Sequence, residues 1–341
     1  MLELDKKKVD FLVTENMSQE VNYVLTDLAP YMDELVDLMC KREIERVYFV
    51  ACGSPLCACQ TAQKLFEEYS DIPCKSYSGA DFFAHPPFVL NERTLVVGIS
   101  QSGQTAEVCD SVKLARERGA MTIAATKSKE GNQLAKEAEF VIAYESECIW
   151  EIHLMITYYL SLSFIKTRPH KEDVEIILED MKKIPEVLSR LMKEVEEDSK
   201  QKGMKASEWK MIYTVSSGPL LPLAYKEGII TMLEFTWTHG SFIDAAEFRH
   251  GPLEVVEEGV PYVFFLGNDA SRSIIQRTIN FVKKLNGSYM VFDINDYEKN
   301  LHPMLSPMIL FVPLEYFYYY LSVSKDHNPD DRRYYGGLVE Y

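Results

Sequence analysis

Two side chains in the stretch of residues 231–252 have the chemistry of a proton-transfer pair. Residues 228–240 read as an apolar helix in which Glu234 is the only formal charge, and burial of a carboxyl there would favour its protonated form. An extended run over residues 241–246 leads to His250, which stands before a Gly-Pro turn and can exchange a proton near neutral pH. Glu234 and His250 are therefore candidate catalytic residues. The alternative is a buried structural glutamate and a turn histidine that only forms hydrogen bonds.

A second candidate site follows an apolar run at residues 95–99, which is typical of a parallel strand covered on both faces. The loop after this run contains Ser100, Gln101, Ser102 and Thr105. Backbone N–H groups and the positive end of the next helix face such a loop, so it could bind a phosphate. The absence of Lys, Arg and a GxxxxGK[ST] pattern favours a phosphomonoester over a nucleoside triphosphate. A helix cap without any ligand is the alternative interpretation.

Two more turns follow predicted strands and could contact the sugar part of a ligand. The turn after residues 46–52 contains Cys52, Gly53 and Ser54. Because the carboxyl ends of neighbouring parallel strands flank one crevice, this turn should lie beside the phosphate loop. Ser216 and Ser217 form the equivalent turn in the second half of the chain, but no anion-binding pattern accompanies them.

Alternating apolar runs and helical stretches predict the elements that position these residues. Five strands are expected in the first half, at residues 46–52, 75–77, 95–99, 121–125 and 140–144. The second half repeats the plan, with strands at 211–215 and 262–266 at a similar spacing. The sequence therefore predicts an α/β protein with two duplicated, doubly wound parallel sheets, each a flavodoxin-like sandwich with flanking helices.

The domain boundaries follow from changes in composition. A charged stretch with helical periodicity over residues 171–200 reads as one helix and as the linker between the halves. We expect five segments, namely a helical N-terminal segment (1–34), a first domain (35–169), a linker (170–200), a second domain (201–331) and a C-terminal tail (332–341).

The composition limits the partners and the compartment. A net charge of −16 argues against binding to nucleic acid or to an anionic membrane surface. No apolar signal core or membrane-length apolar stretch is present, so a cytoplasmic protein is expected. The seven cysteines fit reduced thiols, and the spacing of Cys52, Cys57 and Cys59 does not match a zinc site, so no metal is expected.

The motifs together resemble the tandem sugar isomerase (SIS) family, including the isomerase half of glucosamine 6-phosphate synthase. The resemblance rests on the Ser100–Thr105 loop, the Cys-Gly-Ser turn, the duplicated halves and the sequence Glu-Phe-Arg-His-Gly-Pro-Leu around His250. It implies that the loop binds the phosphate of a hexose 6-phosphate, that Glu234 moves a proton between C1 and C2, and that His250 assists ring opening. It also implies no cofactor. A homodimer or higher homo-oligomer is implied, with active sites where subunits meet.

The chain departs from the synthase pattern at two lysine positions. Thr231 stands where the synthase has a lysine three residues before its glutamate, and Arg332 and Arg333 begin the tail where the synthase has another lysine. The chain also has no glutaminase domain to supply ammonia. The absence of both lysines would suit an enzyme whose substrate already carries an amine, because a lysine amine could form a competing Schiff base with the sugar.

A narrower resemblance is to the fructosamine 6-phosphate deglycases of this family. It extends from residues 1–17 through the segment at 148–154 to the tail at 326–341. It implies hydrolysis of a phosphorylated Amadori compound, such as fructoselysine 6-phosphate, to glucose 6-phosphate and the free amine. A deglycase or isomerase for a related aminosugar phosphate, such as glucoselysine 6-phosphate, and a non-catalytic sugar-phosphate sensor are the alternatives.

Overall fold

The computed structural model describes residues 1–169, 172–334 and 338–340, which form two compact units. The first unit is Asn16–Pro185. The second unit combines Met1–Glu15 with Glu186–Tyr341, so the beginning of the chain folds with its second half. The N-terminal segment expected over residues 1–34 is thus divided between the units. The domain boundaries expected from the sequence stay a prediction.

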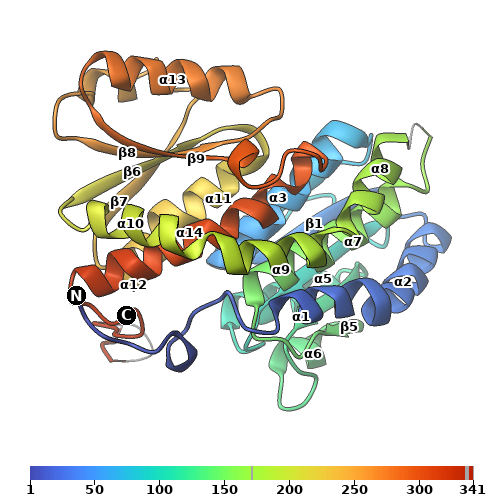
Figure 1. Cartoon of the computed structure of the whole chain (residues 1–341). Coiled ribbons are helices and arrows are strands. Elements are labelled where there is room, and N and C mark those ends of the chain that lie inside the picture. Colours follow the sequence, from blue (N-terminus) through green and yellow to red (C-terminus); the bar gives the residue numbers. More distant parts are fainter. Residues whose placement is uncertain (170–171, 335–337, 341) are drawn as a thin grey trace. The chain divides into compact units, whose positions relative to one another are not determined.

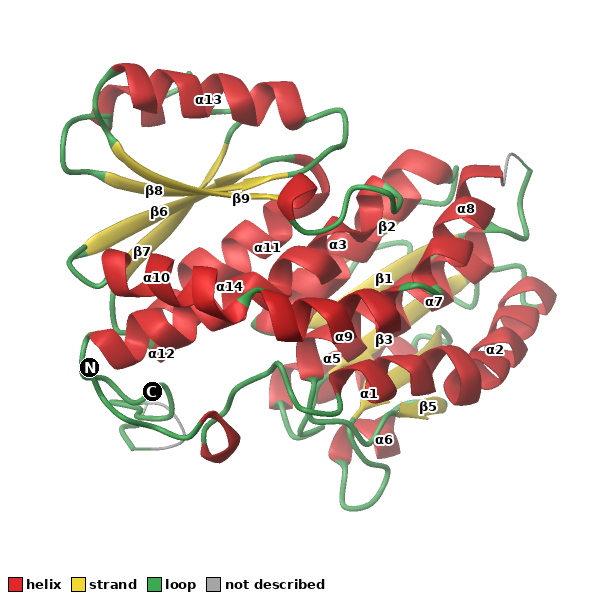
Figure 2. Cartoon of the chain, in the orientation of Figure 1, coloured by secondary structure: helices red, strands yellow, loops and turns green. Residues whose placement is uncertain are grey.

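The first unit contains a five-stranded parallel sheet with the order β2-β1-β3-β4-β5 (Figure 2). The strands are β1 (Arg46–Ala51), β2 (Cys74–Ser78), β3 (Thr94–Ile99), β4 (Met121–Thr126) and β5 (Phe140–Ala143). Every residue of β3 and β4 is buried, which explains why their sequences are predominantly apolar and uncharged. The chain moves outward from β1 to β2 and then returns to β3 on the other side of β1. The point of reversal between β1 and β3 is where open α/β sheets bind ligands.

Helices cover both faces of this sheet because the crossovers keep one hand while the direction of strand addition reverses between β1 and β3. The helices α2 (Ala29–Lys41) and α3 (Ser54–Tyr69) both pack against α7 (Ile149–Ile165). A second group consists of α4 (Gly79–Ala84), α5 (Ala106–Glu117) and α6 (Gln133–Glu137), in which α5 contacts the other two. Gly98 of β3 lets α5 approach closely, since an added Cβ would lie 2.5 Å from Val112 Cγ2.

The second unit contains a four-stranded parallel sheet with the order β7-β6-β8-β9 (Figure 1). The strands are β6 (Met211–Ser216), β7 (His239–Asp244), β8 (Pro261–Leu266) and β9 (Ser288–Asp293). Read in chain order, the arrangement is second, first, third, fourth, as for the first four strands of the other sheet. The repeat seen in the sequence is therefore a repeat of topology.

One face of the second sheet packs on α13 (Arg272–Lys284) through a core that includes Phe264 and Ile275. Helices α10 (Glu196–Ala206), α11 (Leu221–Tyr225) and α14 (Ser306–Ser324) lie on the other face (Figure 1). Nearly all of α14 is buried, which accounts for its predominantly apolar and aromatic sequence. Its tyrosines at positions 316, 318 and 319 belong to the core. In the tail, Tyr334 is exposed, whereas Tyr335 and Tyr341 lie outside the described residues.

The N-terminal arm, Met1–Glu15, is fastened to α14 along its length. The Leu2 N–H donates to the carbonyl of Val323 at 2.7 Å, and the Leu12 N–H donates to Glu315 Oε1 at 2.9 Å. The ring of Phe11 packs between those of Tyr316 and Tyr319 at centroid distances of 5.1 and 5.5 Å. The arm is therefore part of the folded second unit.

The fold class expected from the sequence is confirmed, but one long helix is not. The stretch predicted as a single helix over 171–200 contains α8 (Glu172–Met181), α9 (Ile184–Glu194) and the beginning of α10. Pro185 has no N–H to continue α8 and fits the first turn of a new helix, so the chain breaks there. Within the described residues, no helix combines the length and the apolar character needed to cross a membrane.

Glu315 is a buried acid in the core of the second unit. Burial raises the pKa of its carboxyl to about 7, Lys226 opposes this shift, and Glu227 adds to it. Between pH values of about 4.3, the pKa of an unfolded glutamate, and about 7, the folded protein binds a proton at this site that the unfolded chain does not. The free energy of unfolding contributed by this residue therefore falls as the pH rises through that window, and above it a charged carboxylate must stay buried.

We predict that Glu315→Gln, which remains neutral and retains an oxygen for the Leu12 N–H, removes this pH dependence. Relative to the parent protein, the variant should gain about 2–3 kcal/mol between roughly pH 5 and pH 8. Urea unfolding of both proteins across this range measures the difference. Stability curves that stay parallel would contradict the assignment of this titration to Glu315.

Candidate active site

The expected phosphate loop lies at the carboxyl end of β3 and leads into α5. The Ser100 and Thr105 hydroxyls are 2.9 Å apart, and Ser100 Oγ also accepts a hydrogen bond from the Gly103 N–H. Thr105 occupies the N-cap position, but its side chain makes no bond to the first turn of α5. The hydroxyls thus shape the loop and leave the amino end of the helix without a side-chain cap. The first N–H groups of α5 are therefore not satisfied by a capping side chain, and an anionic ligand could accept their hydrogen bonds.

The remaining loop residues differ in exposure. Ser102 and Gln104 are exposed, Gln101 and Thr105 are half-buried, and Ser100 is buried. Gln101 offers its backbone carbonyl to the Lys127 N–H at 3.2 Å, so its backbone is tied to the segment after β4. Ser102 Oγ accepts from the Gln104 N–H and remains at the surface, where a ligand could reach it.

The Cys-Gly-Ser turn lies beside this loop, as the sequence predicted, because Ala51 of β1 pairs with Ile99 of β3. Gly53 has φ +65°, a conformation that favours glycine, and no atom lies within 4 Å of the position of a Cβ. Burial raises the pKa of the Cys52 thiol, which favours the protonated thiol over a nucleophilic thiolate. Ser54 begins α3 and is half-buried. Two loops therefore meet at the reversal point of the first sheet.

The turn after β6 in the second unit uses its hydroxyls differently. Ser216 Oγ donates to the carbonyl of Phe265 at 2.9 Å and is buried. Ser217 Oγ donates to Asp244 Oδ1 at 2.8 Å. Both side chains therefore have partners within the second unit, and their expected contact with a sugar stays a prediction.

Glu234 and His250 lie at opposite ends of β7. Glu234 is in the short helix α12 (Met232–Phe235), which precedes the strand, whereas His250 is exposed in the turn that follows it. Six residues of parallel strand span about 17–20 Å. Within one chain, the two side chains therefore lie at opposite ends of the strands of the second sheet.

The helix expected over residues 228–240 is wrong in its extent. A π-helical segment, Lys226–Thr231, leads into α12, which ends at Phe235. Trp237 has φ +48°, which a continuing helix does not allow, and β7 already begins at His239. Because the helix ends one residue after Glu234, that side chain is only half-buried, with 33% of its area exposed. The burial of Glu234 that the apolar sequence around it suggests is therefore only partial.

Arg332 is a functional candidate that the sequence reasoning did not assign. Its Nε donates to Glu234 Oε1 at 3.1 Å, and its guanidinium lies 4.9 Å from the centroid of the Phe235 ring. Its Nη1 also donates to the carbonyl of Pro329, which fixes the side chain on the tail. An ion pair of this kind requires the carboxylate, the form of Glu234 that can accept a proton. The signal in the sequence was the position of Arg332, close to where the synthase places a lysine.

Lys226 places an amine beside Thr231, the position where the synthase has a lysine. Its Nζ donates to Thr231 Oγ1 at 3.0 Å and to Glu227 Oε1 at 2.8 Å, and both charged side chains are fully buried. A buried and ion-paired ammonium is a poor nucleophile, because attack requires the free amine.

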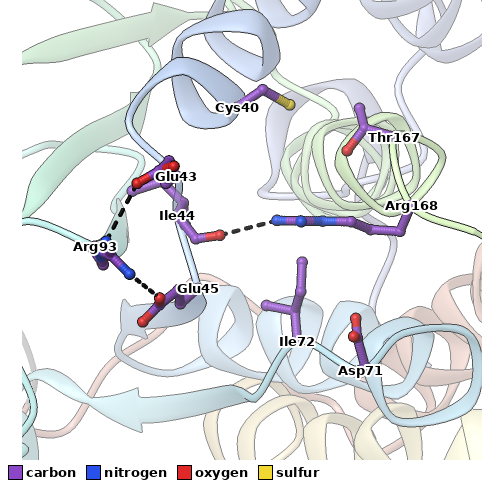
Figure 3. A pocket seen from close by; sticks show the side chains of 9 residues that line it. All are labelled: Cys40, Glu43, Ile44, Glu45, Asp71, Ile72, Arg93, Thr167 and Arg168. Carbon is purple, nitrogen blue, oxygen red and sulfur yellow. Dashed lines mark hydrogen bonds and ion pairs between the residues drawn. The ribbon is translucent and has the colours of Figure 1, made fainter.

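A large pocket in the first unit lies away from the candidate phosphate loop (Figure 3). It is at the amino ends of the strands, where Glu45 precedes β1 and Arg93 precedes β3. Arg93 pairs with Glu43 and Glu45, and Arg168 Nη2 donates to the carbonyl of Ile44 at 3.1 Å. The guanidinium groups of this pocket are thus engaged by the protein itself, and open α/β sheets bind ligands at the other edge.

Comparisons with known proteins identify the family of the chain. The model of the SIS domain matches residues 42–167, which include the loop and the turn. Fructoselysine 6-phosphate deglycase of Escherichia coli (strain K12) is 50% identical over 341 residues, covering 100% of both chains. Fructosamine deglycase FrlB of Bacillus subtilis (strain 168) is 28% identical over 327 residues, covering 93% of this chain and 98% of the relative. A crystal structure of a Bacillus subtilis protein described as a phosphosugar isomerase has a TM-score of 0.82 at 28% identity, covering 89% and 96%.

The fold, the loop at the reversal point and the family match define the chain as a SIS-domain protein. The 50% sequence identity over the full length assigns the chain to a narrower family within this class. Within the class, the chain belongs to the fructoselysine 6-phosphate deglycase family.

Gly103 generates a test of how the phosphate loop is built. It has φ +61°, and an added Cβ would lie 1.9 Å from Asn132 Nδ2. Asn132 cannot easily move, because it donates to Thr126 Oγ1 and accepts from the Ala135 N–H. Gly131 has a similar φ of +64° but no atom within 4 Å of its Cβ position, so it is a matched control.

We predict that Gly103→Ala lowers the free energy of unfolding more than Gly131→Ala does. Both variants should lose about 1–2 kcal/mol to the left-handed backbone, and the steric clash should add about 1–3 kcal/mol at position 103 only. Urea unfolding of the two variants measures the difference. Equal losses would show that the loop can accommodate a side chain beside Asn132.

Proposed function

We propose that the protein hydrolyses fructoselysine 6-phosphate to glucose 6-phosphate and lysine. The observation that carries this proposal is the 50% identity, without uncovered segments, to a fructoselysine 6-phosphate deglycase. The ion pair of Glu234 with Arg332 in the second unit supports it, as does the hydroxyl-lined loop of the first unit.

The chemistry follows from the structure of a fructosamine. The compound has a carbonyl at C2 and an amine on C1, so water cannot cleave the C1–N bond directly. Removal of a proton from C1 gives an enaminol, and protonation at C2 gives an imine at C1. Water adds to this imine, and the amine leaves with a proton. The central steps are a 1,2-proton shift, which general acid–base groups can perform.

The proposed roles follow the chemistry of each side chain. Glu234 takes the C1 proton and returns it to C2, and Arg332 holds its carboxylate in place. The Ser100–Thr105 loop binds the 6-phosphate at the amino end of α5. His250 assists ring opening and protonates an oxygen or the departing amine. The turn containing Cys52, Gly53 and Ser54 contacts the sugar.

The opposite placement of Glu234 and His250 on β7 supports an oligomeric enzyme. One chain cannot bring these two side chains onto one sugar across the length of the strand. A second copy of the chain can provide the histidine instead. We therefore propose a homodimer, or a multiple of it, in which His250 of one copy acts with Glu234 of another.

We also propose that the enzyme is cytoplasmic. None of the seven cysteines, all of which lie in the described part of the chain, forms a disulfide, and four of them are buried. This state is the one expected in a reducing compartment.

Purified protein incubated with fructoselysine 6-phosphate should release glucose 6-phosphate, and Glu234→Gln should lower kcat by about 10²–10⁴-fold. The amide has nearly the shape of the carboxylate but cannot accept the C1 proton. Coupled detection of glucose 6-phosphate measures turnover, with circular dichroism as the control for folding. Near-full turnover by the glutamine variant would remove Glu234 from the mechanism, and no turnover by the parent protein would leave a sensor as the better description.

Mixing two inactive variants tests whether His250 acts on another copy. If Glu234→Gln and His250→Ala are unfolded and refolded together in equal amounts, half of the dimers should be mixed. Each mixed dimer has one intact site, so roughly one quarter of the parent activity should return. The double variant refolded with inactive Glu234→Gln is the control, because no intact pair can form in it. Failure of the first mixture to regain activity, while the parent protein refolds normally, would contradict the sharing of sites.

A further inference from the structure

The tail residue after Arg332 is placed in an unusual way. The guanidinium of Arg333 lies 4.0 Å from the centroid of the Trp237 ring. On the same indole, the buried imidazole of His327 packs at a centroid distance of 4.1 Å. The two rings and the guanidinium form what we call the Trp237 stack (His327, Trp237 and Arg333).

The Trp237 stack is held in place by the backbone on both sides. Trp237 adopts φ +48°, a left-handed conformation that is strained for a residue with a side chain. His327 is tied to α14, since its N–H donates to the carbonyl of Ser322 at 3.1 Å and its own carbonyl accepts from Ser322 Oγ at 2.9 Å. The indole is therefore a fixed platform for the guanidinium rather than a mobile surface ring.

The charges around the stack leave Arg333 as its cation. Burial lowers the pKa of His327; Asp331 opposes this shift, whereas Arg332 and Arg333 add to it, and the net shift is downward, so this imidazole is neutral near pH 7. Arg333 is exposed, and no carboxylate in the described part of the chain pairs with it. This is notable in a chain with 52 acidic and 36 basic residues. Of the nearby acids, Asp330 instead accepts a hydrogen bond from the Asp10 N–H at 2.8 Å.

The position of the stack relates it to the proposed reaction. Glu234 would remove the proton from C1, and the amine nitrogen is bonded to that same carbon. Arg332 contacts Glu234 directly, Arg333 is the next residue, and Trp237 is only three residues beyond Glu234. Side chains beside Glu234 are therefore close enough to reach the substituent on the amine as well as the sugar. In fructoselysine, that substituent is an amino acid with a free carboxylate.

We propose that Arg333, supported by Trp237, binds the carboxylate of the amino-acid part of the substrate and so selects fructosamine phosphates made from amino acids. The proposal rests on the deglycase function proposed above. A planar guanidinium binds a carboxylate through two parallel hydrogen bonds, and stacking on an indole leaves its N–H edge available for them. The aromatic support also limits the side-chain freedom that binding would otherwise remove.

The experiment compares two synthetic substrates that differ only in the carboxylate. One is fructoselysine 6-phosphate, and the other is the same sugar phosphate linked to 1,5-diaminopentane, which is lysine without its carboxylate. Steady-state kinetics are measured on the full chain for the parent protein, Arg333→Ala and Arg333→Lys. Arg277→Ala, at an exposed position on α13, is the matched control.

The parent protein should prefer the lysine conjugate. Arg333→Ala should lower kcat/KM for it by about 10- to 100-fold, mainly through KM, and change the diamine conjugate by less than about 3-fold. Arg333→Lys should restore part of the loss, and Arg277→Ala should change neither substrate. Unchanged turnover of the diamine conjugate by Arg333→Ala also shows that the variant is folded.

Three outcomes would overturn the proposal. Equal losses on both substrates would make Arg333 a general structural residue, and no loss on either would remove it from binding. A parent protein that does not distinguish the substrates would show that the carboxylate is not read. If the parent protein cleaves neither substrate, the deglycase function itself fails, and that result is distinct from the other three.

Discussion

Parallel pairing of the strands is the constraint on which the arrangement of the candidate residues depends. Every strand in both sheets runs in the same direction as its neighbours, so each must be followed by a crossover that returns to the starting edge. In each sheet, all turns that follow strands therefore lie at the carboxyl ends of the strands, and all segments that precede strands lie at the amino ends. This rule places the Cys52 turn beside the Ser100 loop, because the strands that precede them are neighbours. It also separates Glu234, before β7, from His250, after it.

The parts of the fold that the sequence predicted are those decided by local pattern. Buried parallel strands need apolar residues on both faces, and β3 is such a run bounded by a Ser-Gln-Ser-Gly loop. Its limits could therefore be read almost to the residue. The duplication of the two halves could be inferred because the similar spacing of strand-turn units is preserved in the sequence.

The parts that the sequence did not predict depend on contacts between distant segments. The end of α12 is fixed by the left-handed Trp237, which is stacked on His327 from beyond α14, and nothing local marks that contact. The burial of Glu234 was overestimated for the same reason, since its partner Arg332 lies 98 residues away. Ser216 looked like a ligand-binding hydroxyl, but it serves a carbonyl 49 residues away. In each case, a polar group found its partner through tertiary structure that periodicity does not encode.

The attachment of the N-terminal arm affects the order in which the chain can fold. Leu12 and its acceptor Glu315 are separated by 303 residues, and the whole of the first unit lies between them. At ribosomal speeds, the arm leaves the ribosome about 15–60 s before its docking helix has been synthesised. During that interval, Phe11 has none of the α14 tyrosines to cover it, so the nascent chain carries an uncovered aromatic residue at its leading end. Residues 16–185 can fold during translation, whereas completion of the other unit must wait for α14 to emerge.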